Sequence, residues 1–437
     1  MTKYVIIGIG AAGISAASAI RGQDPDGEIL MIGDEADGYY SRPGLAYYLA
    51  NEIPEDSLFP FRDKDFKNLS IRRLHDRVNA ILPQEHMLKT TKGKTIKYDK
   101  LLIAVGAAAA RANLPGANLT GVFKLDNIND TRKIIQYARK AKTAVVVGGG
   151  ITALEIVEGL IARKVKVHYF LRGDRYWGNV LDKTESKIIE WRLKKEGVHI
   201  HYHTEAEEII GKKDRVVGVR TKNGEGLRCE IVGIAIGIQP RLKLAQASGI
   251  NIDRGILVNE YLQTNQPDIF AAGDVAQVLD PITGETILDS LWNPARMQGH
   301  TAGLNMSGQR EPYRKEVPFN VTRLAGLTTT IIGQVGRGVD EDLVGIARGD
   351  SETWRKIPDA IASQSNFEVN RLRLMVGENT LLGAVIMGDQ TLSKYLQEIV
   401  VNQVDISPIR DQLLAAKSPI ADIITNFWIP QRGQYAA

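Results

Sequence analysis

The sequence opens with Lys3-Tyr4-Val5-Ile6-Ile7-Gly8-Ile9-Gly10-Ala11-Ala12-Gly13, and a run rich in small and apolar residues continues to position 20. The apolar residues before the first glycine predict a short buried strand, and the G-x-G-x-x-G spacing predicts a turn into a helix. In such a turn Gly8 allows the sharp bend, Gly10 lets a phosphate approach the backbone, and Gly13 lets helix and strand pack closely. The free N–H groups at the start of the helix would face a pyrophosphate. We therefore expect a dinucleotide cradle here, although a glycine-rich turn made for packing alone has the same pattern.

Length and composition indicate a globular protein with more than one domain. At 437 residues the chain exceeds the usual size of a single core, so we expect two or three domains. The formal net charge is only +4 and no basic block is interleaved with aromatic residues, so nucleic acid binding is not expected. The predicted strand at residue 3 leaves no room for a signal peptide, and no apolar run reaches membrane-spanning length. These features predict a cytoplasmic protein without a transmembrane segment.

Acidic and basic residues follow the second predicted strand, which spans positions 28 to 32. An acid about 20 residues beyond the third glycine of such a cradle normally accepts hydrogen bonds from ribose hydroxyls. Asp34 is the first choice for this role and Glu35 the second, with an ordinary turn acid as the alternative. Arg42, in Tyr40-Ser41-Arg42-Pro43, is expected to contact the cofactor through its forked donor, unless it is simply a surface arginine.

The opening pattern recurs in the middle of the chain. Thr143-Ala144-Val145-Val146-Val147-Gly148-Gly149-Gly150-Ile151-Thr152-Ala153 again predicts strand, G-x-G-x-x-A turn and helix. After the next strand, where an acid would bind a free ribose 2′-hydroxyl, the chain has Leu171, followed by Arg172 and Arg175. Arginines there can accommodate a 2′-phosphate, so NADPH is modestly favoured over NADH, with two solvated loop arginines as the alternative.

Three further stretches complete the pattern. Apolar strands end at Gly106 and at Gly237, and Ala271-Ala272-Gly273-Asp274 follows another buried strand. We expect Asp274 at a helix start, where its carboxylate would lie near polyol hydroxyls, although a helix cap is the simpler explanation. Beyond a boundary near residue 315 the chain alternates short strands with later helices. Its tail, 420–430, is expected to pack on a neighbouring domain or subunit, with membrane contact as the less favoured alternative.

Taken together, the two cradles, the strand ending at Gly106 and the Gly273-Asp274 string resemble the pyridine nucleotide-disulfide oxidoreductase class of flavoproteins, over residues 1 to about 310. The resemblance implies an α/β fold with two Rossmann-like dinucleotide-binding domains and a C-terminal α+β domain. It also implies FAD on the first cradle, NAD(P)H on the second, and Asp274 at the ribityl chain. The expected domains are 1–115 and 246–314 for FAD, 116–245 for NAD(P), and 315–437 at the C-terminus, where dimerisation is left open.

The cysteine content narrows the resemblance. Cys229 is the single cysteine, which excludes an intramolecular disulfide, and its position favours a strand of the nicotinamide domain. The chain therefore resembles the cysteine-free branch, which includes ferredoxin and rubredoxin reductases and the flavin portion of nitrite reductases. Gly33-Asp34-Glu35 and Tyr40-Ser41-Arg42-Pro43 look like motifs of that branch. One departure is Tyr47, which stands where many of these reductases carry a lysine that pairs with a glutamate, here Glu155, near flavin N5.

This branch implies an FAD-dependent NAD(P)H oxidoreductase in which hydride passes to flavin N5 and electrons then pass to an acceptor. The expected acceptor is a small acidic carrier of rubredoxin or ferredoxin type, or a small molecule. The alternative is a redox-sensing flavoprotein resembling apoptosis-inducing-factor relatives, with nucleotide-controlled conformation or oligomerisation. Glu155 and Trp292 are the expected catalytic residues, with a core role as the alternative for Trp292. No metal site is expected. The residues expected to bind the cofactors are Gly8, Gly10, Ala12, Gly13, Asp34, Glu35, Arg42, Val78, Ala104, Gly106, Gly273, Asp274, Gly148, Gly150, Ile151, Ala153, Arg172, Arg175 and Gly237.

Overall fold

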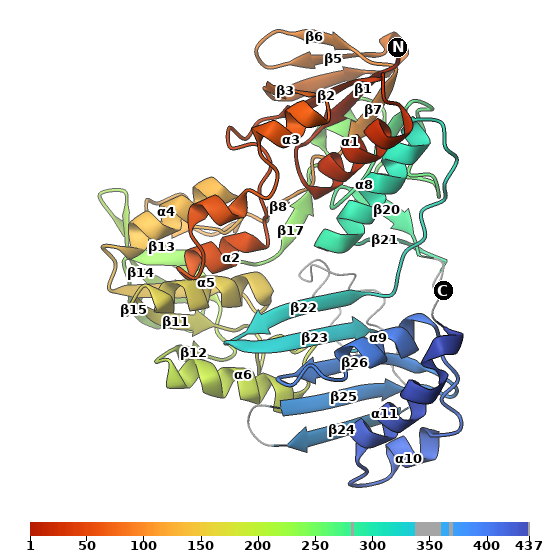
Figure 1. The fold of residues 1–437 in the computed structure, drawn as a ribbon. Coiled ribbons are helices and arrows are strands. Elements are labelled where there is room, and N and C mark those ends of the chain that lie inside the picture. Colours follow the sequence, from red (N-terminus) through yellow and green to blue (C-terminus); the bar gives the residue numbers. More distant parts are fainter. Residues whose placement is uncertain (281–283, 337–359, 367–369, 436–437) are drawn as a thin grey trace.

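The computed structural model describes residues 1–280, 284–336, 360–366 and 370–435, and three five-stranded sheets organise these residues (Figure 1). Two of the sheets are parallel and each contains one of the glycine-rich turns. The third is antiparallel and is formed by the C-terminal part of the chain. The predicted α/β fold class, with two Rossmann-like units and a C-terminal α+β region, is therefore confirmed.

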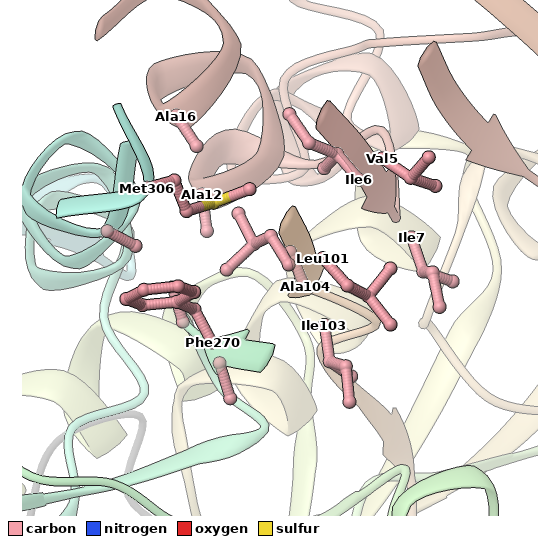
Figure 2. Packing of buried hydrophobic residues seen from close by; sticks show 14 of the residues in the cluster. Val5, Ile6, Ile7, Ala12, Ala16, Leu101, Ile103, Ala104, Phe270 and Met306 are labelled. Carbon is pink, nitrogen blue, oxygen red and sulfur yellow. The ribbon is translucent and has the colours of Figure 1, made fainter. Parts of the chain in front are cut away.

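The first sheet has the order β19-β7-β1-β2-β3, with β1 at its centre. Residues 4 to 7 of β1 are buried, because neighbouring strands and helices cover both faces of the strand. Figure 2 shows Ala12 and Ala16 of α1, Met306 of α8 and Phe270 of β19 gathered beside the central strands. The strands are β1 (Lys3–Ile7), β2 (Glu28–Gly33), β3 (Ile71–His75), β7 (Lys100–Ile103) and β19 (Ile269–Ala271). The helices of this unit are α1 (Ala11–Gln23), α2 (Gly44–Leu49), α3 (Asp63–Asn68), α7 (Lys243–Ala247) and α8 (Trp292–Met306).

Two small sheets accompany the first one. An antiparallel sheet, β4-β5-β6, forms around the glycine turn at residue 93, and a mixed sheet, β18-β20-β21, follows β17 in the chain. Their strands are β4 (Val78–Leu82), β5 (Met87–Thr90), β6 (Thr95–Lys97), β18 (Ile256–Leu257), β20 (Ala276–Leu279) and β21 (Thr286–Leu288).

The second sheet has the order β12-β11-β10-β16-β9, with the second glycine-rich turn after its central strand β10. An antiparallel meander, β13-β14-β15, shares an apolar cluster with this sheet. The strands are β9 (Val122–Phe123), β10 (Thr143–Val147), β11 (Lys166–Phe170), β12 (His199–His201), β13 (Ala206–Lys212), β14 (Arg215–Thr221), β15 (Gly226–Arg228) and β16 (Ile231–Ile234). The helices are α4 (Ile128–Ala138), α5 (Ile151–Ala162) and α6 (Lys183–Lys195).

A pair of short antiparallel strands connects the two parallel units. The outgoing strand is β8 (Ala107–Ala109) and the returning strand is β17 (Ile238–Pro240). The flanking glycines are part of the same ladder, because Arg241 N–H donates to Gly106 O at 3.1 Å and Ala110 N–H donates to Gly237 O at 2.9 Å. The first unit is thus interrupted by the second, and it resumes after β17 (Figure 1).

The C-terminal region forms the antiparallel sheet β22-β23-β26-β25-β24 with helices α9 to α11 beside it. Trp428 of α11 is fully buried among the apolar residues of this same region, and its indole N–H donates to Glu398 at 2.7 Å. The tail therefore packs within its own unit, which corrects the expectation that it packs on a neighbouring one. No helix in the described part of the chain is long and apolar enough to cross a membrane. The elements are β22 (Phe319–Leu324), β23 (Leu327–Gly333), β24 (Ala360–Asn366), β25 (Asn370–Val376), β26 (Leu381–Met387), α9 (Ser393–Val401), α10 (Arg410–Leu414) and α11 (Ile420–Gln431).

One part of the third sheet packs on the second unit. Leu324, Leu327 and Met375 of this sheet belong to the same apolar cluster as Tyr176 and Leu193 of the second unit. Two buried arginines reinforce this contact, because Arg371 and Arg373 of β25 pair with Asp182 and Glu185 at the start of α6.

Candidate functional site

The first cradle has the geometry that its glycines predict. Gly8 has φ +117°, and a Cβ added there would lie 2.1 Å from Ala104 O on the adjacent strand end. A Cβ at Gly13 would lie 2.2 Å from Gly8 O, so this glycine is required for helix and strand to approach. A Cβ at Gly10 would meet nothing within 4 Å. Gly10 is also the N-cap of α1 and no side chain caps the helix, so its first N–H groups are available to an anion.

The acids after β2 are both paired with arginines. Arg77 donates to Asp34 through Nε at 2.9 Å and Nη2 at 2.7 Å, and Arg42 donates to Glu35 at 2.5 Å. Arg42 also donates to Asp126 O at 2.6 Å, so it joins Glu35 to the segment before α4. Val78, the first residue of β4, is buried and directly follows Arg77. Arg77 was not predicted as a site residue, although its place between β3, the strand next to β2, and β4 was a usable signal.

Gly273 and Asp274 lie in a turn between β19 and β20, and no helix begins there. The expected helix start at Asp274 is therefore wrong, because the chain bends at Gly273, with φ +79°, into another strand. A Cβ at Gly273 would lie 3.1 Å from the Cβ of Ala12, so the turn lies beside the start of α1. Gln298 of α8 accepts the Gly273 N–H at 2.8 Å, and its own Nε2 is buried without a partner among the described residues. Sequence reasoning missed Gln298.

Trp292 is the first residue of α8 and its side chain is exposed. The guanidinium of Arg296 lies 4.7 Å from the centre of the Trp292 ring. Burial raises the pKa of the nearby Tyr39 hydroxyl, and a hydrogen bond with Trp292 acts against that shift. An exposed ring at the start of α8 is not a core residue, so the alternative of a pure core role for Trp292 is wrong.

The second cradle repeats the geometry of the first. Gly148 has φ +143°, and an added Cβ would lie 2.1 Å from Ala235 O and 3.1 Å from the Cβ of Ala153. Gly150 is the N-cap of α5, again without a side-chain cap, and Ile151 is the first helical residue. The backbone N–H of Trp177 donates to Gly149 O at 3.1 Å, so the loop after β11 is fixed against this turn.

The two arginines after β11 lie in different surroundings. Arg175 donates to Asp174 at 2.7 Å and to Gly178 O at 2.9 Å, so it stabilises its own loop. Arg172 is exposed directly after Leu171, whose N–H donates to His201 O at 2.9 Å. Arg172 is thus the better placed of the two for a ligand at the end of β11.

Helices α2 and α5 bring the two units into contact. A Cβ at Gly159 of α5 would lie 2.4 Å from Leu49 Cγ of α2, and Arg163 donates to Leu49 O at 2.8 Å. Glu155 lies on α5 one turn after the second cradle. Burial raises the pKa of Glu158, and charge repulsion from Glu155 adds to that shift. Tyr47 is on α2, with the guanidinium of Arg323 5.4 Å from its ring centre.

Cys229 lies between β15 and β16, which corrects the expectation that it is a strand residue, and it belongs to the apolar cluster shared by the second sheet and its meander. Burial raises the pKa of its thiol to about 12, so it is held as a neutral thiol far from the reactive range. Among the described residues no group of three His, Cys, Asp or Glu side chains could hold a metal ion.

Both cradles fit a dinucleotide pyrophosphate. Each combines a glycine at which an added Cβ would lie about 2 Å from a backbone oxygen of the neighbouring strand end with an uncapped helix start. Acids lie at the end of the second strand of the first unit, whereas an arginine lies at the corresponding end of the second unit.

Comparisons with known proteins agree with this geometry. The family described as "Pyridine nucleotide-disulphide oxidoreductase" matches residues 2–299. The 3-phenylpropionate/cinnamic acid dioxygenase ferredoxin–NAD(+) reductase component of Photorhabdus laumondii is 27% identical over 408 residues, covering 92% of this chain and 97% of that protein. The NADH-rubredoxin oxidoreductase of Clostridium acetobutylicum is 28% identical over 400 residues, covering 91% and 94%. The crystal structure of NADH:rubredoxin oxidoreductase from that organism matches with a TM-score of 0.75 at 25% identity, covering 98% of this chain and 99% of that one.

Proposed function

Because the chain belongs to the pyridine nucleotide-disulphide oxidoreductase family and is an FAD-dependent NAD(P)H oxidoreductase, we propose that its acceptor is a small electron-carrier protein of rubredoxin or ferredoxin type. The observation that carries this proposal is the pair of cradles joined by β8 and β17 in a chain whose single cysteine is buried elsewhere. Without a thiol beside the flavin, electrons cannot leave through a disulfide. A one-electron carrier is the acceptor that the named relatives support.

The side chains and backbone of this chain bind and orient the two dinucleotides, and no side chain acts as a nucleophile. When bound, FAD supplies the redox chemistry by accepting hydride from NAD(P)H and releasing electrons to an acceptor. The uncapped starts of α1 and α5 bind the two pyrophosphates, and Asp34 or Glu35 accepts hydrogen bonds from the ribose hydroxyls while it stays paired with Arg77 or Arg42. Asp274, in the turn beside the start of α1, is assigned to the ribityl chain, and Glu155 and Trp292 to the flavin surroundings.

The acceptor is tested by anaerobic reduction of the flavin followed by acceptor addition. We expect the visible flavin spectrum to bleach with one nicotinamide nucleotide and to recover on addition of oxidised rubredoxin or ferredoxin. Rapid recovery with quinones and none with either carrier would contradict the carrier proposal. Slow turnover with every acceptor, combined with nucleotide-dependent dimerisation by light scattering, would instead favour a redox-sensing flavoprotein. Light scattering also shows whether the C-terminal region forms a homodimer.

We further propose that NADPH is preferred over NADH. Arg172 supports this proposal because it is exposed at the end of β11, where an acid would otherwise bind the 2′-hydroxyl. Arg172→Glu should lower the kcat/KM ratio of NADPH to NADH by about tenfold or more. Arg228→Gln, which changes an exposed arginine of β15, is the matched control. A wild type that prefers NADH would overturn the preference, and an unchanged ratio in the Arg172 variant would show that Arg172 does not set it.

A further inference from the structure

The tip of the β22–β23 hairpin contacts both nucleotide units at once. Its two turn residues have positive φ, +48° at Ala325 and +74° at Gly326, which is the geometry of a tight hairpin turn. The Gly326 N–H donates to Glu158 of α5 at 3.1 Å, and Arg192 of α6 donates to Ala325 O at 2.6 Å. The turn is therefore fixed to two helices of the second unit.

Arg323, just before this turn, reaches the first unit. It forms a two-pronged ion pair with Glu52, one contact of which is 2.7 Å, and Glu52 is the third residue after the end of α2. The same guanidinium lies over Tyr47 of α2 and attracts Glu158 of α5. The Arg323 guanidinium of the C-terminal region thus lies between Glu52 of the first unit and Glu158 of the second.

The helices joined in this way lead to the two cradles. α5 begins at the second cradle, and α2 follows Arg42 and the acids at the end of β2. Their relative position sets the distance between anything bound at the two cradles. Hydride transfer requires reacting atoms about 3–3.5 Å apart, so a small rotation of one helix has a large effect on its rate.

We propose that the hairpin tip holds α2 and α5 in the orientation that brings the two bound nucleotides together, with Arg323 as the positioning residue. The cation neutralises repulsion between Glu52 and Glu158, which would otherwise separate the helices. Glu155 of α5, one turn away, adds to that repulsion. This inference rests on the proposed function, because it assigns the residue to hydride transfer between the two cradles.

Glu158 makes the contact sensitive to pH. Burial raises the pKa of Glu158 to about 7, Arg323 and the Gly326 N–H oppose that shift, and Glu155 and Glu52 add to it. The buried Tyr169 and Tyr176 are close enough for the charge of Glu158 to act on their hydroxyls. If the hairpin separated, Glu158 would be more exposed and its pKa would lie nearer the ordinary carboxyl value, so ionisation of Glu158 favours separation. The contact between the hairpin tip and α5 therefore weakens as pH rises through about 7.

The test is anaerobic stopped-flow reduction of the purified holoenzyme by saturating nucleotide, from pH 6 to pH 9. Arg323→Gln should lower the limiting rate of flavin bleaching by about tenfold or more while nucleotide affinity and flavin content stay near wild type. Arg323→Lys should restore part of the rate, and Arg72→Gln, which breaks an exposed ion pair with Glu28, should change nothing. Loss of affinity with an unchanged limiting rate would overturn the proposal.

Hydrogen exchange without nucleotide supplies a measurement independent of activity. In the wild type, protection of peptides covering 323–327 and 47–52 should fall as pH increases through about 7. Glu158→Gln should remove that dependence, and Arg323→Gln should lower protection at every pH. Unchanged protection in both variants would overturn the proposal that the hairpin tip holds α2 and α5 together. If neither nucleotide reduces the wild type, the proposed function fails, and the exchange experiment still decides whether the hairpin holds the two helices.

Discussion

Gly8 and Gly10 lie two residues apart in one turn but differ in what an added methyl group would meet. At Gly8 the φ of +117° and the 2.1 Å approach to Ala104 O both oppose a side chain, whereas at Gly10 the space is open and φ is −97°. Gly8→Ala should destabilise the protein by at least about 3 kcal/mol. Gly10→Ala should fold normally and lose FAD, because its methyl group lies where the pyrophosphate approaches.

Thermal unfolding and the flavin absorbance of each purified variant distinguish these two outcomes. A Gly10→Ala protein with full flavin content would show that the pyrophosphate does not approach this turn. A Gly8→Ala protein as stable as wild type would contradict the close contact with Ala104.

His168 provides a second prediction for a single side chain. Its ring stacks on His199 with centroids 4.9 Å apart, and its Nδ1 lies 2.9 Å from Nε2 of His201. Burial lowers the pKa of His168 to about 4, and the charges of His201, His199 and Lys166 act in the same direction. Between about pH 6.5 and pH 4, His168 therefore binds a proton in the unfolded chain but not in the folded protein. The stabilising contribution is present above that range and is lost as pH falls through it.

Urea unfolding at pH 7 and pH 5 measures this loss. In the wild type, the urea midpoint should fall when the pH is lowered from 7 to 5. His168→Asn should reduce this fall, since Asn does not titrate. His300→Gln, at an exposed position of α8, is the control and should leave the fall unchanged. An equal fall in wild type and the His168 variant would contradict the depressed pKa.

At the scale of elements, helices α1 and α8 cross closely because glycines line the contact. A Cβ at Gly299 would lie 2.1 Å from Ala12 O, and one at Gly303 would lie 2.5 Å from Ala16 O. Gly299→Ala should therefore cost about 1–3 kcal/mol and lower flavin content, because α1 carries the first cradle. Gly22→Ala, at an open position of α1, should instead stabilise the protein by about 0.5–1 kcal/mol. Chemical denaturation measures both, and a neutral Gly299 variant would contradict the crossing.

The elements predicted from the sequence are those whose local pattern determines their structure. Both strand-turn-helix units follow from glycine spacing and apolar runs, so β1, α1, β10 and α5 were predictable. The helix start expected at Asp274 was wrong, because Gly-Asp after a buried strand is compatible with a helix start and with a turn into another strand. Gln298 and Gly299 were not predicted as site residues, because their importance depends on which helix α8 crosses, and the local sequence does not specify that partner.

At the scale of the whole molecule, the position of the C-terminal region depends on contacts that no local pattern indicates. Arg373 of β25 is nearly fully buried, donates to Glu185 at 2.7 Å, and also donates to Val180 O and Val335 O at 2.9 Å. A buried arginine in a strand is rare unless it is paired. Its partner lies about 190 residues earlier in the chain, at the start of α6. Local periodicity could therefore predict the third sheet but not its contact with the nicotinamide unit.

Removing Arg373 should consequently weaken the whole assembly. Arg373→Ala leaves the fully buried Glu185 without its main counter-charge, and we expect a loss of about 3–5 kcal/mol. Arg72→Ala, which breaks an exposed pair, should cost no more than about 1 kcal/mol. Because both parallel sheets remain intact, flavin binding at the first cradle should survive in Arg373→Ala at temperatures below its unfolding. Denaturation followed by circular dichroism and by flavin fluorescence tests this, since the C-terminal region should separate before the flavin is released. Coincident transitions at the wild-type midpoint would show that this buried cluster does not hold the C-terminal sheet to the nicotinamide unit.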